Sequence, residues 1–286
     1  MKVHEALRRA SSFLAESGRE ARAAEILLGH ALGASRTQLF MQMQEEMPEA
    51  AAAVFGDLIR AHAGGIPVQH LTGTEPFFGR TFHVSRDVLI PRPETEELVA
   101  HVLETIPGLF GGRQLAAVDV GTGSGVIAAT LAMECEQMHV SAVDVSPEAL
   151  AVAVRNAERL GARVDFYEGD LLAPFMNEGK KFDLIVSNLP YIPEEEAEAL
   201  DPLVKDHEPS LALYGGKDGL SLYRQLIGQI PKVETGGPCL IAFEIGIGQS
   251  EAVSGLIRRQ FGDRAQVSVL RDINGKERIV SAVIGK

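Results

Sequence analysis

The stretch VDVGTGSG, residues 118–125, decides the fold of this chain. An apolar run at 115–120 leads into it, and a helical pattern begins near residue 124. Glycines let a backbone approach a ligand closely, and the free N–H groups at a helix start favour an anionic group. The alternative is a plain glycine turn, but the strand and helix patterns on either side favour a cofactor-binding loop.

The spacing of the glycines indicates which cofactor the loop binds. Dinucleotide-binding folds use the pattern G-x-G-x-x-G. Here Gly125 comes one residue early, and Val126 stands where that pattern has its third glycine. This spacing favours S-adenosylmethionine, whose methionine carboxylate and amine would lie over the loop. The expected cofactor-binding residues of the loop are Asp119, Gly121, Thr122, Gly123, Ser124 and Gly125.

Outward from the loop, strand and helix patterns alternate to the end of the chain. Strands are predicted at 115–120, 138–143, 164–168, 182–187, 238–245, 265–270 and 277–284, and helices near 124–134, 147–160, 218–230 and 248–260. Such alternation predicts an α/β fold with a doubly wound parallel sheet. The last two strands are joined only by residues 272–275, whose Asn-Gly pair is a hairpin signal, so the final strand should be antiparallel. This is the outline of a class I methyltransferase.

The beginning of the chain follows a different pattern. Residues 1–73 are rich in Ala and Leu at helical spacing, and they predict a small all-helical domain of three helices, the third opening at Pro48. Residues 74–92 predict a hairpin linker with its turn at 78–80. The methyltransferase domain is then expected over 93–286, beginning with a helix whose first turn is acidic.

Two carboxylates follow the next strands. Asp144 ends the second strand, where a carboxylate can accept hydrogen bonds from both ribose hydroxyls. The alternative is that it caps the next helix, a role that Ser146 equally suits. Asp170 follows the third strand, where it can accept a hydrogen bond from an adenine amino group while Leu171 packs against the adenine ring. The alternative is an aspartate in a surface turn.

The segment SNLPYIP, residues 187–193, follows the fourth strand and should face the cofactor loop. An amide or aromatic amine is a weak nucleophile, so it needs acceptors that hold its NH₂ group and aim the nitrogen. The Asn188 side-chain oxygen and the Leu189 carbonyl suit this role, and Asn188 is also expected among the cofactor-binding residues. Pro190 restricts Leu189, and Tyr191 can stack on a planar amide. The alternative is an Asn-Pro turn with a surface tyrosine.

Composition excludes several classes of function. A net charge of −12 argues against general nucleic-acid binding, which depends on basic residues. Cys135 and Cys239 lie in apolar stretches without other ligands at metal spacing, so we expect buried thiols and no metal. The chain lacks a signal-peptide pattern and a long apolar run, which predicts a cytoplasmic protein with no membrane partner.

The chain resembles the release-factor glutamine N5-methyltransferases nearly end to end. The motifs that carry this resemblance are GIPVQHLTG (65–73), FFG (77–79), IPRPETE (90–96), the two loops above, HEPSLAL (207–213) and GGKDGL (215–220). The resemblance implies methyl transfer from S-adenosylmethionine to the glutamine of the Gly-Gly-Gln loop in class 1 peptide chain release factors. It also implies that the N-terminal domain recognises that substrate.

The chain departs from the family at one position. The family motif is Asn-Pro-Pro-Tyr, whereas this chain has Leu189 in the second place. Leucine keeps the backbone carbonyl but loses the fixed φ of proline. Two other functions remain open at this point: a nucleic-acid methyltransferase acting on an exocyclic amine, and a non-catalytic S-adenosylmethionine-binding adaptor.

Overall fold

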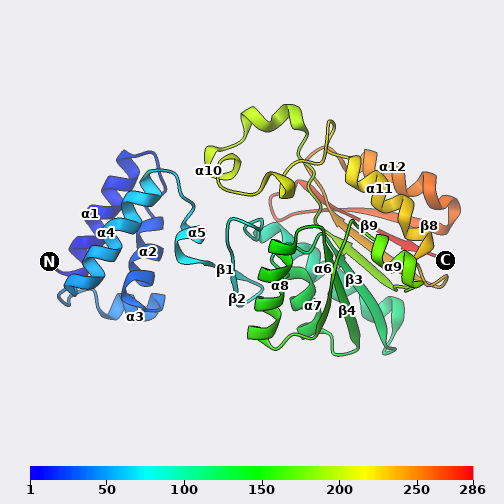
Figure 1. The fold of residues 1–286 in the computed structure, drawn as a ribbon, viewed down its shortest axis with the longest axis horizontal. Helices are drawn as coiled ribbons and strands as arrows, with labels where there is room; N and C mark the ends of the chain where they lie inside the picture. Colours follow the sequence, from blue (N-terminus) through cyan, green and yellow to red (C-terminus); the bar gives the residue numbers. More distant parts are fainter. Residues whose placement is uncertain (286) are drawn as a thin grey trace. The chain divides into compact units, whose positions relative to one another are not determined.

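The computed structural model describes residues 1–285, which form two compact units (Figure 1). The first unit comprises Met1–Thr74 together with Asp201–His207, and the second comprises 75–200 and the residues from Glu208 onward. Residues 201–207 belong to the helical unit, whereas the sequence-based division placed them in the methyltransferase domain. Among residues 1–285, no helix combines the length and apolarity needed to cross a membrane.

The first unit is helical, as predicted, but it has more helices than the three expected. They are α1 (Val3–Glu16), α2 (Ala23–Leu32), α3 (Arg36–Met41), α4 (Glu49–Ala63), α5 (Val68–Thr72) and the short α10 (Pro202–Lys205). Ser35 accepts a hydrogen bond from the Gln38 backbone N–H, which caps α3, a helix too short to stand out by periodicity. Leu14, Leu27 and Leu28 are fully buried at the centre of this unit.

The second unit is built on a seven-stranded sheet. The strands lie in the order β5 (Val164–Glu168), β4 (Met138–Asp144), β3 (Leu115–Val120), β6 (Leu184–Ser187), β7 (Cys239–Glu244), β9 (Glu277–Ile284) and β8 (Ala265–Arg271). The pairs from β5 to β7 are parallel, and β9 is antiparallel to both of its neighbours. This confirms the predicted doubly wound sheet with an antiparallel final strand.

Helices cover both faces of the sheet (Figure 1). One face carries α6 (Pro93–Phe110), α7 (Val126–Glu134) and α8 (Pro147–Leu160), and the other carries α9 (Ala173–Glu178), α11 (Ser221–Gln229) and α12 (Ser250–Phe261). Each face buries its own apolar cluster. The predicted hairpin is present as β1 (Thr74–Phe77) and β2 (Arg80–His83). Short 3₁₀ turns at Glu194–Ala199, Ser210–Ala212, Ile230–Lys232 and Gly262–Arg264 complete the described chain.

The strand order reverses beside β3, and this places the two predicted loops together. The chain runs outward from β3 to β4 and β5, then returns to β6 on the other side of β3. Val120 and Ser187 pair at the carboxyl ends of β3 and β6, and the Ser187 hydroxyl donates to the Val120 carbonyl over 2.5 Å. The glycine loop and the Asn188 loop therefore begin side by side, at the point where such sheets bind ligands.

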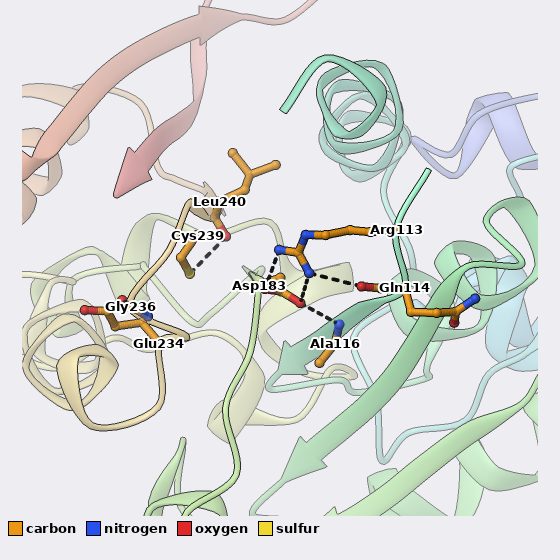
Figure 2. A network of polar contacts seen from close by, with 8 residues as sticks. All are labelled: Arg113, Gln114, Ala116, Asp183, Glu234, Gly236, Cys239 and Leu240. Carbon is orange, nitrogen blue, oxygen red and sulfur yellow. Dashed lines mark hydrogen bonds and ion pairs between the residues drawn. The ribbon is translucent and has the colours of Figure 1, made fainter. Parts of the chain in front are cut away.

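An ion pair between the half-exposed Arg113 and the buried Asp183 fixes the opposite ends of the same strands (Figure 2). The Arg113 guanidinium donates twice to the Asp183 carboxylate, over 2.7 and 3.2 Å, and the Ala116 N–H donates to the same carboxylate over 3.0 Å. Cys239 lies next to this network and is buried, which raises the pKa of its thiol to about 12. Cys135, by contrast, is partly exposed, so the expectation that both thiols are buried was wrong for that residue.

The Asp183 carboxyl makes the stability of the sheet depend on pH. Burial by itself raises its pKa, but hydrogen bonds from Arg113 and the Ala116 N–H outweigh burial and hold the pKa below its usual value. A carboxyl with a depressed pKa stabilises the fold above its unfolded pKa, and this contribution disappears as the pH falls through the folded value.

We expect Asp183→Asn to lower the free energy of unfolding by about 1.5–3 kcal/mol at pH 7, because charge-assisted hydrogen bonds become neutral ones. Denaturant titrations of wild type and Asp183→Asn should show the difference in their free energies of unfolding narrowing as the pH is lowered from 5 toward 3. A difference that stays constant over that range would mean that the ionised carboxylate does not stabilise the sheet.

Candidate functional site

A cavity of about 310 Å³ lies in the second unit, at the carboxyl ends of the parallel strands. Its wall brings together three groups of residues that the sequence placed in one site, from the glycine loop, the ends of β4 and β5, and the Asn188 loop. They are Gly121, Thr122, Gly123, Ser124, Asp144, Asp170, Leu171, Asn188, Leu189 and Pro190. Asp119, Gly125 and Tyr191 were predicted to belong to the same site but do not line the cavity.

The glycine loop is held by its neighbours in a conformation that only glycine adopts easily. The N–H groups of Gly121 and Thr122 donate to the Val143 carbonyl over 2.9 and 3.1 Å. Gly125 has a φ of 79°, and a methyl group there would come within 3.0 Å of the Ala153 side chain on α8. The close approach of α8 therefore explains the early third glycine, which acts through packing and backbone conformation.

Asp119 lies beneath the loop, where it is fully buried. Its carboxylate accepts from the Thr122 hydroxyl over 2.6 Å and from the Ala128 N–H over 3.2 Å. Burial raises the pKa of this carboxyl to about 7, although both hydrogen bonds oppose the rise. The geometry gives Asp119 a supporting position, tying the loop to the first turn of α7, instead of a place on the cavity wall.

Asp144 lies on the wall and also shapes the loop. One carboxylate oxygen accepts from the Gly123 N–H over 2.8 Å, and the other accepts from the Ser146 N–H over 3.0 Å. The helix cap considered for Asp144 belongs to Ser146, whose hydroxyl accepts from the Ala149 N–H over 3.1 Å. The carboxylate of Asp144 is thereby fixed in orientation at the cavity.

The second carboxylate is followed by a strained residue. Asp170 lines the cavity beside Leu171, whose φ of 50° is unusual for a leucine. Such a conformation costs on the order of 1 kcal/mol and persists where surrounding contacts hold it. Here the next backbone N–H, from Leu172, donates to the Gln229 side chain over 2.8 Å. This bend turns the Leu171 side chain toward a largely buried position on the wall.

In the Asn188 loop, the Asn188 side chain has a defined orientation. Its Nδ2 atom donates to the Thr95 hydroxyl over 3.1 Å, so the amide nitrogen is committed to the protein. The oxygen, on the other branch of the amide, is left to act as an acceptor. The Leu189 carbonyl lies 3.4 Å from the Tyr223 hydroxyl, which also donates to the Glu244 carbonyl at shorter range.

Leu189, which departs from the family motif, packs against the cofactor loop. Its side chain is 3% exposed, and a methyl group at Gly121 would come within 3.0 Å of Leu189 Cδ2. The two loops therefore touch through this side chain. A bulkier residue at either position would have to displace the other, so Leu189 and Gly121 form a matched pair.

Tyr191 is mostly buried behind the loop. Its carbonyl accepts from the Gln249 side chain over 2.9 Å, and its ring packs close to Gly246. Burial and the nearby Glu244 raise the pKa of its phenol to about 12, so the group stays protonated near neutral pH. This suits a packing role for the ring rather than a role as a base.

The PRPETE segment contributes contacts that sequence reasoning missed. Three of its side chains reach three separate parts of the chain: Arg92 pairs with Glu208 over 2.5 Å, Thr95 donates to Glu244 over 2.6 Å, and Glu96 accepts from the Phe78 N–H over 2.8 Å. The partners lie 18 to 149 positions away in the chain, so periodicity gave no signal for them. The charged residues that flank Pro93, Arg92 before it and Glu94 and Glu96 after it, were the one available hint.

The glycines of GGKDGL support the Asn188 loop from behind. A methyl group at Gly215 would come within 2.4 Å of the Pro190 carbonyl oxygen, and one at Gly219 would clash with the Tyr191 carbonyl. The Gly215 N–H also donates to the Ile192 carbonyl over 3.0 Å. Close backbone packing, which requires these glycines, therefore fixes the path of the chain after Asn188. Among residues 1–285, no cluster of His, Cys, Asp and Glu is suited to a metal ion.

Comparisons with known proteins agree with this arrangement. The family model described as the PrmC N-terminal domain matches residues 5–73, and a methyltransferase domain model matches residues 117–205. A release factor glutamine methyltransferase from Bacillus anthracis is 51% identical over 284 residues, covering 99% of this chain and 100% of that protein. Another from Bacillus subtilis is 50% identical over 285 residues, covering 99% of this chain and 98% of that protein.

A solved structure of similar fold is the SAM-dependent methyltransferase from Agrobacterium tumefaciens, with a TM-score of 0.51 and 14% identity, covering 74% of this chain and 70% of that one. The fold, the cavity and these likenesses define a class I S-adenosylmethionine-dependent methyltransferase. The identity over nearly the full length then specifies the family: the chain belongs to the release factor glutamine methyltransferases.

The contact between the two loops can be tested through Leu189. We expect Leu189→Ala to lower the free energy of unfolding of the cofactor-free protein by about 2–5 kcal/mol, because it leaves a cavity in a buried position. Leu189→Met, which keeps the volume, should cost less than about 1.5 kcal/mol. Denaturant unfolding measures both, and equal losses for the two variants would contradict the tight packing of this side chain against Gly121.

Proposed function

We propose that this enzyme transfers the methyl group of S-adenosylmethionine to the side-chain amide nitrogen of the glutamine in the Gly-Gly-Gln loop of class 1 peptide chain release factors. The observation that carries the proposal is the Asn188 amide, oriented by Thr95 on the wall of the cofactor cavity. The full-length likeness to proteins named release factor glutamine methyltransferase supports the choice of substrate.

The residues of the cavity fit the cofactor. Backbone groups of Gly121–Ser124 suit the methionine portion, the Asp144 carboxylate suits the ribose hydroxyls, and Asp170 with Leu171 suits the adenine. Asp119 and Gly125 hold the loop in shape from outside the cavity. When bound, S-adenosylmethionine supplies an electrophilic methyl group on a sulfonium.

Asn188 and Leu189 position the acceptor. Asn188 Oδ1 and the Leu189 carbonyl accept hydrogen bonds from the two N–H groups of the glutamine amide, which aims its nitrogen toward the cavity. These acceptors also stabilise the positive charge that the nitrogen gains during attack. Pro190 restricts Leu189 to extended backbone. The neutral ring of Tyr191 packs near Gly246 behind the loop and supports it there.

We propose that the helical unit, 1–73 in the sequence-based division, helps recognise the release factor. Large apolar side chains are exposed on it, among them Phe13, Phe40 and Met41. Exposed apolar groups of this kind suit a protein partner. The net charge of −12 favours a partner other than nucleic acid, and a translation factor as substrate fits a cytoplasmic enzyme.

The ribose role of Asp144 predicts a loss of cofactor affinity. Asp144→Ala should weaken S-adenosylmethionine binding by about 1.5–3 kcal/mol, the usual worth of hydrogen bonds to a charged group. Calorimetry on the folded variant measures this. Asp165→Ala is the matched control, because Asp165 pairs with His139 away from the cavity and should leave affinity unchanged. Equal affinities for wild type and Asp144→Ala would remove Asp144 from the cofactor site.

The proposed reaction is tested by labelled methyl transfer to purified release factor, with RNA and DNA in parallel. Wild type should label only the release factor. Asn188→Ala should slow single-turnover transfer by about 10²–10³-fold, the typical worth of a preorganised polar group, while keeping most cofactor affinity. Labelling of RNA or DNA instead would identify a nucleic-acid methyltransferase. Cofactor binding with no labelled product would identify a non-catalytic adaptor.

A further inference from the structure

A buried carboxylate lies behind the catalytic loop. Glu244, the last residue of β7, is 1% exposed. Its carboxylate accepts a hydrogen bond from the Thr95 hydroxyl over 2.6 Å, and Thr95 is itself buried at the start of α6. Burying a carboxylate is costly unless it is hydrogen-bonded, so this contact needs an explanation beyond packing. Nothing in the proposed reaction so far uses Glu244.

The hydroxyl of Thr95 has one proton, and its direction determines what Asn188 can do. Because that proton points to Glu244, Thr95 presents only lone pairs to its other neighbour. The Asn188 Nδ2 atom donates to these lone pairs over 3.1 Å. A flipped amide would bring Asn188 Oδ1 against the Thr95 oxygen, acceptor against acceptor. The hydrogen-bonded chain therefore selects one of the two amide orientations.

We propose that Glu244 and Thr95 are positioning residues that hold the Asn188 amide with its oxygen available to the substrate. The inference rests on the proposed function for its catalytic consequence, but the orientation itself does not depend on which substrate is methylated. Thr95 belongs to the PRPETE segment, and this gives the threonine of that segment a physical role. Glu244 acts on Asn188 through Thr95 and through its own hydrogen bond from the Asn188 side chain, and it need not touch the substrate or the cofactor.

The ionisation of Glu244 provides a signature for this arrangement. Burial raises the pKa of its carboxyl to about 7, opposed by hydrogen bonds from Thr95 and Asn188 and by Arg278 on β9, and assisted by Glu94 on α6. The two other titratable groups facing this region, the phenols of Tyr191 and Tyr223, have pKa values raised by burial and stay protonated near neutral pH.

The direction of the pH effect follows from the hydrogen bonds. A protonated Glu244 donates to Thr95 instead of accepting from it, so the Thr95 proton is free to turn toward Asn188. That reversal favours the flipped amide, which withdraws the oxygen from the substrate. Methyl transfer should therefore be fastest above the Glu244 pKa and should fall as the pH drops through about 7.

The test compares variants in single-turnover methylation of release factor and in S-adenosylmethionine affinity. Thr95→Val keeps the shape but removes the hydroxyl, and it should slow transfer by about 10- to 100-fold, as loss of a supporting hydrogen bond typically does. Thr95→Ser should restore most of the rate. In both Thr95 variants the affinity for S-adenosylmethionine should change less than about threefold, because the hydroxyl orients Asn188 and not the cofactor.

Glu244→Gln should remove the fall in the methyl-transfer rate that wild type shows as the pH drops through about 7.

Thr130→Val is the matched control, since Thr130 is fully buried on α7 and its hydroxyl has no hydrogen-bond partner within residues 1–285. It should keep the wild-type rate and pH profile. A Thr95→Val enzyme that behaves like Thr130→Val, with an unchanged acid limb in Glu244→Gln, would overturn the proposal.

A readout without substrate separates this proposal from the proposed function. The NMR signals of the Asn188 side-chain NH₂, assigned by their loss in Asn188→Asp, should titrate with Glu244 in wild type and lose that titration in Glu244→Gln and Thr95→Val. If wild type fails to methylate release factor but these signals titrate, the function is wrong and the orientation stands. If the titration of these signals is unchanged in Glu244→Gln and Thr95→Val, the proposed orientation of Asn188 is refuted, whatever the activity.

Discussion

The pairing of Val120 with Ser187 is the constraint on which the site depends. It joins the carboxyl ends of β3 and β6 where the strand order reverses, and the Ser187 hydroxyl reinforces it by donating to the Val120 carbonyl. The residues that follow, Gly121 and Asn188, start adjacent loops for this reason alone. The pair of Arg113 with the buried Asp183 holds the opposite ends of these strands, so the register that aligns the loops is fixed at both ends.

What the sequence predicted well was local. The glycine spacing, the strand and helix alternation and the Asn-Gly hairpin each depend on residues close together in the chain, and the structure has all three. The rule that ligands bind beyond the carboxyl ends of parallel strands also placed the glycine loop, the ends of β4 and β5 and the Asn188 loop together, and residues of all three line one cavity. Asp119, Gly125 and Tyr191, which the sequence placed in the same site, lie outside the wall of this cavity.

What the sequence did not predict depends on contacts between distant residues. Thr95 and Glu244 are 149 positions apart, and Arg92 and Glu208 are 116 apart, so no periodicity relates them. The short helices α3, α5, α9 and α10 were missed for another reason: four to six residues make too few turns to show an amphipathic pattern. Leu189 shows the same limit, since its contact with Gly121 is visible only once β3 and β6 are paired.

The central claim is that Asn188 and Leu189 hold a glutamine amide beside the cofactor cavity. The most direct measurement is a crystal structure of the full chain with S-adenosylhomocysteine and a class 1 release factor. We expect the glutamine side-chain nitrogen to lie within hydrogen-bond range, about 3.2 Å, of both Asn188 Oδ1 and the Leu189 carbonyl oxygen. A glutamine bound away from these two atoms, or an Asn188 amide with Nδ2 toward the substrate, would contradict it.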